Sequence, residues 1–323
     1  MVERRRFRYR LLVSLLVSAL MLAAFGATDS PYLRVDGGPL VQVGRPVHGS
    51  WTVTAVRIRR ATWSQWARAE MAGEWTYRAD RADRADRAVA ADAAATGAMA
   101  RSQTYAVLVA AQLAAGRAPV GGAGLQVTED TAASRAAGLR VGDVLLAAGQ
   151  QDVMTPLRTS ADLRRAAAPG SVVRVLITPK TLGNEWGTAV VRRMTADQLV
   201  DVPVGPGVSA HAYSVGGVQG PSAGLLLTLA RVDDLTSGDL TGGRRVAGTG
   251  AIALDGGVTS VGWIIEKVRS AAAAGVEVFF VPAPQAADAA RAARGTPLRV
   301  VPVGSVSEAI GWLCGNGGHA PIC

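Results

Sequence analysis

Strand-like and helix-like apolar patterns alternate along the last third of the chain. After residue 200, short runs rich in β-branched residues are separated by glycine-containing turns from runs with a helical period. Ser305 and Glu308 have the spacing of a capping box, which opens a helix. We expect strands at 208–215, 246–254, 276–281 and 298–303, and helices at 222–229, 264–274, 286–294 and 305–313. This alternation predicts a sheet flanked by helices, that is, an α/β (α+β) domain.

Residues 28–116 show other patterns. Residues 28–60 favour extended structure, with a strand at 51–58. Residues 97–116 contain an Ala-rich helical pattern that ends at a glycine. Between these two segments, residues 78–88 repeat the triplet Arg-Ala-Asp, to which we assign no function.

The N-terminus combines positive charge with an apolar run. Residues 11–27 carry no charge, and this run of 17 residues lies at the lower limit of the ~17–25 residues of a membrane-spanning helix. The arginines before it favour retention of the N-terminus in the cytoplasm, which places the remainder of the chain outside. Ala24 and Gly26 also suit the cleavage site of a signal peptide. Both alternatives, an anchor or a cleaved signal, export residues 28–323.

The charge distribution argues against a nucleic-acid partner. The chain has 34 basic and 25 acidic residues, a net charge of +9, and five arginines lie within the first ten residues. The remainder of the sequence shows no basic stripe. Lys180 and Lys267 are the only lysines. Because arginine serves wherever charge alone matters, a retained lysine suggests a role that arginine cannot fill, such as losing its proton.

The sequence lacks the common motifs for metals and nucleotides. It contains neither Cys-x-x-Cys nor His-Glu-x-x-His, and neither lysine follows a glycine as a Walker A motif requires. We therefore expect no metal and no cofactor, and no ATP hydrolysis through a P-loop. Cys314 and Cys323 are the two cysteines, and outside the cytoplasm they could form a small disulfide loop or stay as free thiols.

Two segments carry candidate chemistry. Ser222 lies in Gly-Pro-Ser-Ala-Gly, where a glycine loop meets an expected helix. The N–H groups of a helix N-terminus can stabilise an oxyanion, although a serine there can also be a simple N-cap. Lys267 lies among apolar residues, and burial lowers the pKa of a lysine until its neutral amine can take a proton from a serine hydroxyl. An ordinary surface lysine after Glu266 is the alternative.

Ser222 and Lys267 belong to a set of short stretches that occur in order within residues 201–313, at 220–224, 247–250, 255–258, 266–267, 273–275 and 281–282. Together these stretches resemble the proteolytic domain of Lon-type Ser-Lys peptidases. The resemblance implies that Ser222 is the nucleophile and Lys267 the general base. It also implies that Thr249 positions this dyad, and that the backbone from Gly220 to Ala223 forms the oxyanion hole.

Some positions depart from the Lon pattern. Gly262-Trp263 stand where the family usually has two glycines before the lysine helix, so the tryptophan could narrow the substrate cleft or shift Lys267. Gln285 stands at the position of a family asparagine. His211 lies where some Lon proteins carry a histidine, but the alignment is loose there and we expect a structural residue.

Residues 118–200 have a β-rich pattern and resemble a PDZ domain. The sequence Ala-Gly-Leu-x-x-Gly-Asp-Val is typical of that family, and a glycine loop, a helix at 160–168 and a strand at 172–177 accompany it. PDZ domains bind an extended peptide by adding it as a strand. The implied peptide site consists of Gly124, Leu125, Gln126 and Val127, facing the helix that carries Ala161 and Leu163. The alternative is a small packing domain with a blocked groove.

Together, these features resemble the exported, membrane-anchored and ATP-independent Lon-like proteases of bacteria. In that family the PDZ domain interrupts the protease fold, so we expect residues 28–117 to pack with the protease domain. The resemblance implies protein or peptide substrates and a homo-oligomeric ring, for example a hexamer. The expected division is a cytoplasmic basic segment 1–10, a transmembrane anchor or signal peptide 11–27, an extracytoplasmic region 28–117, a PDZ domain 118–200, a Lon-like domain 201–317 and a tail 318–323.

The sequence leaves two alternatives to a membrane-anchored serine endopeptidase. One is a catalytically weak or inactive module that binds peptides through the PDZ domain or serves as an assembly scaffold. The other is an esterase of the α/β-hydrolase class, in which Asp255 or Asp288 and then His319 would follow Ser222. The short remainder after the serine and the missing HGGG-type loop disfavour the esterase.

Overall fold

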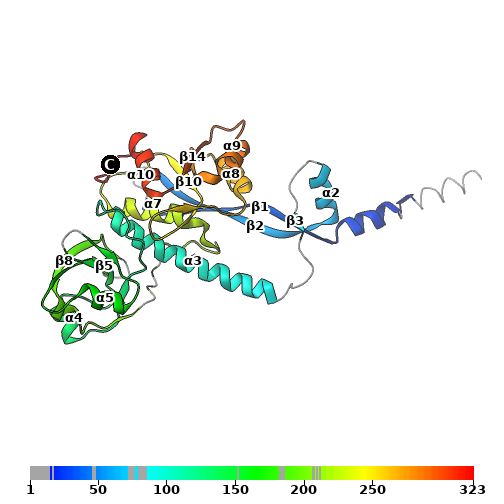
Figure 1. Cartoon of the computed structure of the whole chain (residues 1–323). Coiled ribbons are helices and arrows are strands. Elements are labelled where there is room, and N and C mark those ends of the chain that lie inside the picture. Colours follow the sequence, from blue (N-terminus) through cyan, green and yellow to red (C-terminus); the bar gives the residue numbers. More distant parts are fainter. Residues whose placement is uncertain are drawn as a thin grey trace, which may run out of the picture. The chain divides into compact units, whose positions relative to one another are not determined.

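The computed structural model describes residues 15–16, 18–45, 49–71, 77–78, 86–150, 153–181, 186–205, 208, 210 and 212–323 (Figure 1). The chain divides into two compact units. The first consists of residues 1–37 and 56–90, and the second of residues 38–55 and 91–323.

The first unit contains an apolar helical segment, parts of two long strands and a short helix. Residues 18–26 are helical and precede β1. Phe25 stacks on Trp63, and Tyr32 stacks on Trp66, with ring centroids 5.7 Å and 5.1 Å apart. The Phe25–Trp63 contact joins the end of the helical segment to α2. The elements are β1 (Asp29–Val43), β2 (Ser50–Thr62), α2 (Trp63–Met71) and β3 (Tyr77–Arg78), and both long strands continue into the second unit.

The segment expected to anchor the chain, residues 11–27, lies partly outside the described residues, at 11–14 and 17. In its described part, Leu16, Leu20 and Leu22 are exposed. Within the portion of the chain that the structure describes, no helix has both the length and the apolar character needed to cross a membrane.

The second unit is organised around a mainly parallel sheet. Its strands include β10 (Arg245–Gly248), β13 (Val278–Pro282) and β14 (Arg299–Val303), in the order β14-β13-β10-β2-β1. β10 pairs in parallel with β13 on one side and with β2 on the other, where Val246 lies opposite Trp51. Because parallel sheets are covered on both faces, this sheet separates two hydrophobic cores.

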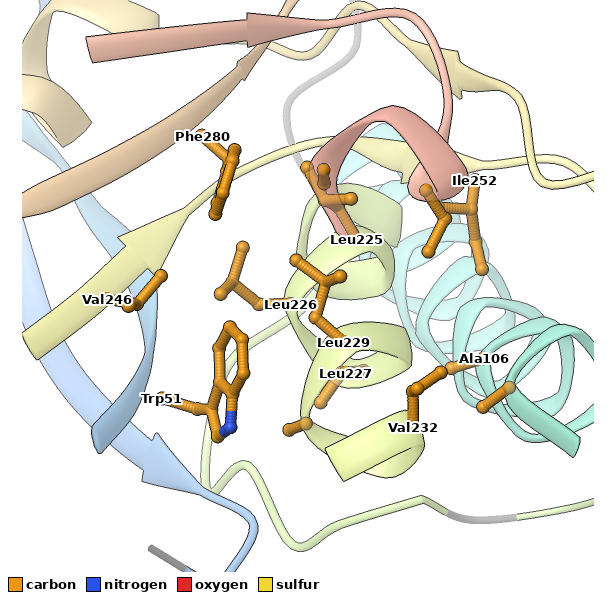
Figure 2. Packing of buried hydrophobic residues seen from close by; sticks show 14 of the residues in the cluster. Trp51, Ala106, Leu225, Leu226, Leu227, Leu229, Val232, Val246, Ile252 and Phe280 are labelled. Atoms are coloured by element: carbon orange, nitrogen blue, oxygen red, sulfur yellow. The ribbon is translucent and has the colours of Figure 1, made fainter. Parts of the chain in front are cut away.

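The first core is built on α7 (Gly224–Leu235). Every residue of this helix from 224 to 232 is buried. Leu226 lies between Trp51 and Phe280 of the sheet (Figure 2). α10 (Val306–Gly315) contributes buried residues to the same core. The N-terminal end of α7 is therefore held in place by apolar packing along the whole helix.

The second core covers the opposite face of the sheet. It is formed by α8 (Ile264–Ala273) and α9 (Ala286–Ala292). Val268 of α8 packs in this core with Ala247 and Phe279. Since successive residues of a strand point to opposite faces, Val246 and Phe280 belong to the first core, and their neighbours Ala247 and Phe279 to the second.

α3 (Asp86–Leu113) takes part in two cores of the second unit. Val109 and Leu113 pack in the core around α7. Leu108 packs instead with Val144 of the β-rich sheet. The C-terminal half of α3 is thus buried between the parallel sheet's core and the β-rich region.

The β-rich region forms a separate sheet in the order β8-β7-β5-β4-β9. β4 is paired on both edges, to β5 and to β9. The elements are β4 (Leu125–Val127), α4 (Ala132–Ala136), β5 (Val144–Gly149), β6 (Thr155–Pro156), α5 (Ser160–Ala166), β7 (Val172–Thr178), β8 (Val190–Thr195), α6 (Ala196–Leu199) and β9 (Val204–Gly205).

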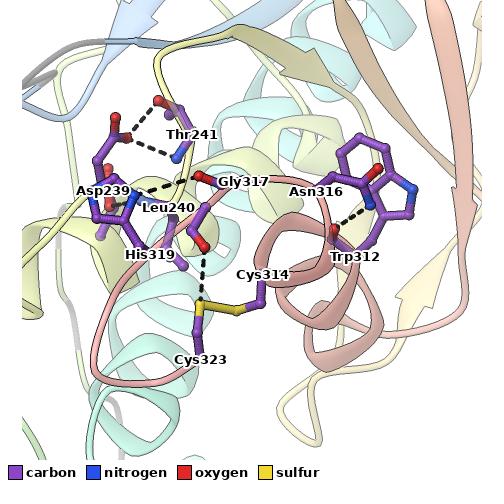
Figure 3. The surroundings of a disulfide bond; sticks show 11 residues. Asp239, Leu240, Thr241, Trp312, Cys314, Asn316, Gly317, His319 and Cys323 are labelled. Atoms are coloured by element: carbon purple, nitrogen blue, oxygen red, sulfur yellow. Dashed lines mark hydrogen bonds between the residues drawn. A yellow bond between two sulfur atoms is a disulfide. The ribbon is translucent and has the colours of Figure 1, made fainter.

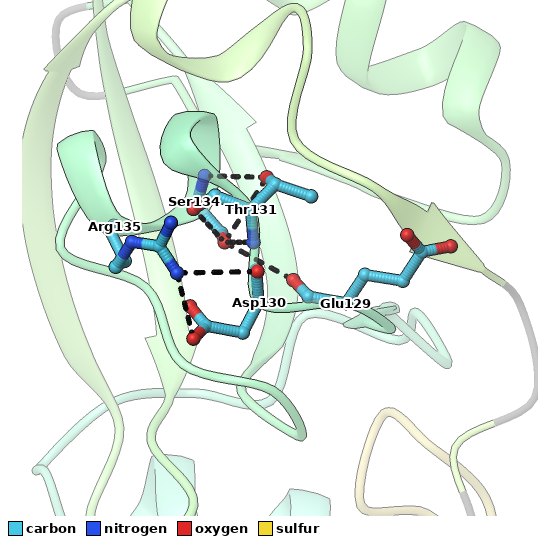
Figure 4. Close-up of polar contacts among 5 residues, drawn as sticks. All are labelled: Glu129, Asp130, Thr131, Ser134 and Arg135. Carbon is cyan, nitrogen blue, oxygen red and sulfur yellow. Dashed lines mark hydrogen bonds and ion pairs between the residues drawn. The ribbon is translucent and has the colours of Figure 1, made fainter.

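A capping box starts the short helix α4 (Figure 4). Ser134 N donates to Thr131 Oγ1 at 3.1 Å, and Thr131 N donates to Ser134 Oγ at 2.7 Å. Arg135 forms an ion pair with Asp130 at 2.9 Å. The two bonds between Thr131 and Ser134 satisfy backbone N–H groups that the helix cannot satisfy internally.

The C-terminal tail is fastened at two points (Figure 3). Cys314, near the end of α10, forms a disulfide with Cys323. His319 N donates to Asp239 O at 2.9 Å, and Asp239 N donates to His319 O at 2.8 Å. Of the two states that the sequence left open for the cysteines, the structure contains the disulfide.

Two expected strands differ from the observed ones. The strand expected at 246–254 is divided into β10 and β11 (Ala251–Ile252), because Gly250 N turns away to bond Ser222 O. The strand expected at 208–215 is wrong for the described residues of that range, which are not in a strand. Their backbone groups bond side chains of α3 in place of a neighbouring strand. The helices expected at 264–274 and 286–294 are confirmed as α8 and α9.

Replacement of Leu226 by alanine should lower the free energy of unfolding by about 3 kcal/mol, because it opens a cavity between Trp51 and Phe280. Chemical denaturation followed by tryptophan fluorescence measures this change. Val200→Ala, at a side chain that is 56 % exposed, is the control and should change the free energy by less than about 0.5 kcal/mol. Equal midpoints for the two variants would contradict the assignment of this core.

Candidate active site

Ser222 lies where a glycine loop runs into α7. η1 (Pro221–Ala223) continues directly into this helix, and Gly220 precedes it with a φ of 81°, a conformation that favours glycine. Ser222 itself is half-buried. The first N–H groups of a helix have no partner within the helix, and the helix dipole makes this end positive. A negative charge that develops beside Ser222 would therefore be stabilised.

Lys267 is buried on α8 and is 3 % exposed. Its Nζ donates a hydrogen bond to Thr249 Oγ1 at 3.1 Å. Burial lowers the pKa of Lys267 to about 8, because a low-dielectric environment disfavours the charged amine. About half of Lys267 is therefore unprotonated near pH 8, which lets the amine accept a proton as a general base must.

Thr249 links the lysine to the serine. Its hydroxyl donates to Ser222 O at 3.1 Å, and the same carbonyl accepts a bond from Gly250 N at 2.8 Å. A hydroxyl has one proton to donate, so the contact with Lys267 must be one in which Thr249 Oγ1 accepts. Ser222 and Lys267 are thus connected through Thr249 and not by a direct hydrogen bond.

Trp263 precedes the lysine helix in a left-handed conformation, with φ 63° and ψ 39°. Among the described residues it is the only residue other than glycine with a positive φ. Its carbonyl nevertheless accepts the helical bond from Lys267 N at 3.1 Å. For a bulky L-residue this conformation costs roughly 1–2 kcal/mol. The tryptophan therefore occupies a backbone position suited to glycine.

Gln285 fastens the turn that leads to Trp263. Val261 N donates to Gln285 Oε1 at 2.9 Å, and Gln285 Nε2 donates to Val261 O at 2.7 Å. The two departures from the Lon pattern therefore lie in one local structure. This pair of bonds holds the backbone two residues before the strained tryptophan.

Sequence reasoning missed a set of polar residues on α3. Ser102, Gln103 and Thr104 are buried, and they bond backbone atoms of Pro221, of Ala212 and Tyr213, and of Ala210, respectively. Three consecutive polar residues in an Ala-rich helix are the signal that could have revealed them. Their partners lie more than 100 residues later in the chain, which the local pattern cannot show.

Tyr213 provides a further attachment of the segment before the glycine loop. Its hydroxyl donates a short hydrogen bond to Asp234 Oδ2 at the end of α7. Burial and this bond raise the pKa of Tyr213, so that the phenol stays protonated. The neighbouring Asp233 accepts a bond from Trp51 Nε1 at 2.9 Å. The Tyr213 bond therefore ties the segment to the C-terminal end of α7, and the Asp233 bond ties that end of α7 to the sheet.

The histidines do not form a catalytic relay with Ser222 among the described residues. His211 lies outside the residues that the structure describes. His319 is exposed in the tail, and its ring nitrogen contacts Gly317 O at 3.5 Å. Asp288 forms an ion pair with Arg291 instead. The arrangement that an α/β-hydrolase esterase would need is absent from this part of the chain.

The β-rich region has a recess beside the beginning of β9. Its volume is about 240 Å³, and it lies between α5 and the segment from Leu199 to Val204. The expected peptide-binding strand β4 already has two neighbours, and Gly124 N donates to Leu157 O at 3.1 Å. An added peptide strand could therefore reach the edge of β9 but not that of β4. The recess-lining side chains include Leu163, Ala167 and Val202.

The segment that contains the candidate site matches a known protein family. Residues 194–310 match the Lon protease (S16) C-terminal proteolytic domain. This serine peptidase domain includes Ser222, Thr249 and Lys267, and its presence supports a protease. A search of the curated proteins finds no match to the chain.

Lys267→Met should raise the free energy of unfolding by about 2 kcal/mol at pH 7, because it removes a buried charge, although it also removes the bond to Thr249. The folded-state pKa lies below the ordinary value, so the unfolded state binds more protons between about pH 8 and pH 10.5. The cost of burying Lys267 therefore falls as the pH rises through this range. Denaturation midpoints of the wild type and of Lys267→Met, at pH 7 and above pH 10, measure how the difference in their free energies of unfolding changes with pH. A difference that does not change with pH would contradict an uncompensated buried amine.

Proposed function

We propose that the protein is a serine endopeptidase that hydrolyses peptide bonds of proteins with a Ser222–Lys267 dyad and without an ATPase of its own. The observation that carries the proposal is the buried Lys267, which bonds the threonine that holds the Ser222 carbonyl. The match of this segment to a Lon proteolytic domain supports it.

The chemistry follows from the two side chains. Neutral Lys267 Nζ accepts the proton of Ser222 Oγ while Oγ attacks the substrate carbonyl carbon. N–H groups of the first turn, at Ser222 and Ala223, stabilise the oxyanion of the tetrahedral intermediate. The leaving amine takes the proton from Lys267, and the acyl group stays on Ser222. Water then attacks this ester, its proton passes to Lys267, and Ser222 Oγ departs with that proton.

We further propose that the protein works outside the cytoplasm, anchored in the membrane by residues 11–27. The charge-free apolar run after the N-terminal arginines supports this placement. The Cys314–Cys323 disulfide supports an oxidising compartment. A homo-oligomeric ring is part of the same proposal and rests on the family resemblance alone.

We also propose that the β-rich region engages peptides in the manner of a PDZ domain. The recess beside α5 supports this role, and its lining combines apolar side chains with Arg164. The peptide would add as a strand beside β9, because β4 is paired on both edges. Gly124, Leu125, Gln126 and Val127 would then support the site from the adjacent strand.

A fluorophosphonate probe should label the full-length protein at Ser222, as located by peptide mass mapping. The labelling rate should rise as the pH rises through about 8, because Lys267 then loses its proton. Ser222→Ala should abolish labelling. Lys267→Arg should slow it by at least about 100-fold, because general-base catalysis contributes 10²–10⁴-fold and arginine stays charged.

Lys180→Arg is the matched control, since Lys180 is the only other lysine. It should be labelled at the wild-type rate. Labelling of Lys267→Arg at the wild-type rate would contradict the dyad. An unlabelled wild-type protein, shown to be folded, would favour the alternative of a peptide-binding module without catalysis.

Val200→Glu should weaken peptide binding at least about tenfold, because it places a charge beside the apolar recess. Fluorescence anisotropy with labelled hexapeptides that end in valine or leucine measures the Kd, in a Ser222→Ala background that prevents cleavage. Val172→Glu is the control, because Val172 of β7 is 59 % exposed, close to the 56 % of Val200, and belongs to the same β-rich region but does not line the recess. Equal Kd values for the two variants would argue against this site.

A further inference from the structure

Three consecutive side chains of α3 are polar in an otherwise apolar stretch. Ser102 and Gln103 are 2 % and 3 % exposed, and residues 106–111 of the helix are buried and apolar. Burying a polar group without a hydrogen bond costs free energy, so these side chains need partners. They find them in one segment, residues 210–221, which leads to Ser222.

Gln103 holds the beginning of this segment. Its Oε1 accepts bonds from Ala212 N at 2.7 Å and from Tyr213 N at 3.0 Å, and its Nε2 donates to Tyr213 O at 2.7 Å. Thr104 Oγ1 accepts a bond from Ala210 N at 3.2 Å. Side chains of α3 thus bond backbone groups of Ala210, Ala212 and Tyr213 that would bond a neighbouring strand if this segment were part of a sheet.

Ser102 holds the end of this segment. Its hydroxyl donates to Pro221 O at 3.0 Å. This carbonyl belongs to the peptide unit that also contains Ser222 N, and in a trans peptide the N–H points opposite to the carbonyl. The Ser102 bond therefore turns the N–H of Ser222 away from α3. The bonds from Thr249 and Gly250 to Ser222 O set the direction of Ala223 N–H in the same way.

The loop between these two attachments contains three glycines that contribute no packing. Gly216, Gly217 and Gly220 have no neighbours within 4 Å of the position where a Cβ would be, whereas Val215 and Val218 pack with the first core. Glycine is the residue with the greatest backbone freedom, so the stretch from Val218 to Ser222 depends on the contacts that fix its ends. Gly224 fits closely against the serine of α3, because a Cβ there would lie 2.7 Å from Ser102 Oγ. The end of the loop, at Pro221 and Gly224, thus contacts Ser102 of α3 directly.

We infer that Ser102 is a positioning residue for the hydrolytic reaction, because its hydroxyl fixes the Pro221–Ser222 peptide unit and with it the nucleophile and its oxyanion-stabilising N–H, while Gln103 anchors the other end of the loop. This inference rests on the proposed function. α3 lies before residues 194–310, so the inference adds a residue outside the matched proteolytic domain.

The test compares Ser102→Ala with the wild type in the full-length protein. We expect kcat for a peptide substrate, and the rate of fluorophosphonate labelling at Ser222, to fall about 10-fold or more, since small misplacements of reacting groups can cost up to about 100-fold. KM should change less than about twofold. The pH at half-maximal rate should not move, because the surroundings of Lys267 are unchanged.

Ser134→Ala is the matched control. It also removes a buried, hydrogen-bonded serine hydroxyl, but at the cap of α4 in the β-rich sheet (Figure 4). It should lose stability without loss of kcat. Ser102→Thr, which keeps a hydroxyl at the same position, should recover part of the labelling rate.

The outcomes separate the inference from the function on which it rests. Wild-type protein labelled at Ser222, with Ser102→Ala labelled at the same rate as Ser134→Ala, would overturn the positioning role alone. A shifted pH midpoint in Ser102→Ala would also overturn it, since the variant would then act through Lys267. Folded wild-type protein without any labelling would overturn the proposed function and the inference with it.

Discussion

The hydroxyl of Thr249 is the contact on which the candidate active site depends. It lies between Lys267 Nζ and Ser222 O, at 3.1 Å from each, and it comes from the end of the central strand β10. β10 is paired on both sides and packed on both faces, so the position of this hydroxyl is determined by the whole sheet. α7 and α8 lie in opposite cores. Thr249 connects them, because it bonds Ser222, directly before α7, and Lys267 on α8.

The chain builds this site from segments that are far apart in sequence. β2 pairs with β10, and α3 packs against α7, although the β-rich sheet lies between them and the proteolytic segment in chain order. The matched residues 194–310 therefore do not contain all of the sheet or the helix that supports the serine loop. Because α3 also packs with the β-rich sheet through Leu108, one rigid helix contacts both parts of the second unit.

Local patterns predicted the elements that carry the chemistry, but not the contacts between them. Periodicity was sufficient for α8 and α9. The grouping of Ser222, Thr249 and Lys267 came from the resemblance to Lon-type peptidases, and in the structure hydrogen bonds connect the three residues. The strand expected at 208–215 was wrong for the described residues of that range, because Gln103, about 110 residues earlier, takes the place of a neighbouring strand in bonding their backbone. β9 was missed because a strand of two residues is too short to show an alternation of apolar and polar positions. Long-range polar partners and very short strands leave no local signature.

The pKa of Lys267 is lowered by burial and not by a neighbouring charge, and this cause bears on the proposed catalysis. Burial alone lowers this pKa, so the balance between amine and ammonium depends on how much water reaches Nζ. A substrate that covers the site removes water and favours the neutral amine further. In the proposed mechanism, the neutral form of Lys267 that accepts the proton is then most populated when substrate is bound. Arginine would stay charged under the same desolvation, so in the proposed mechanism it could not replace Lys267, one of the two lysines of the chain.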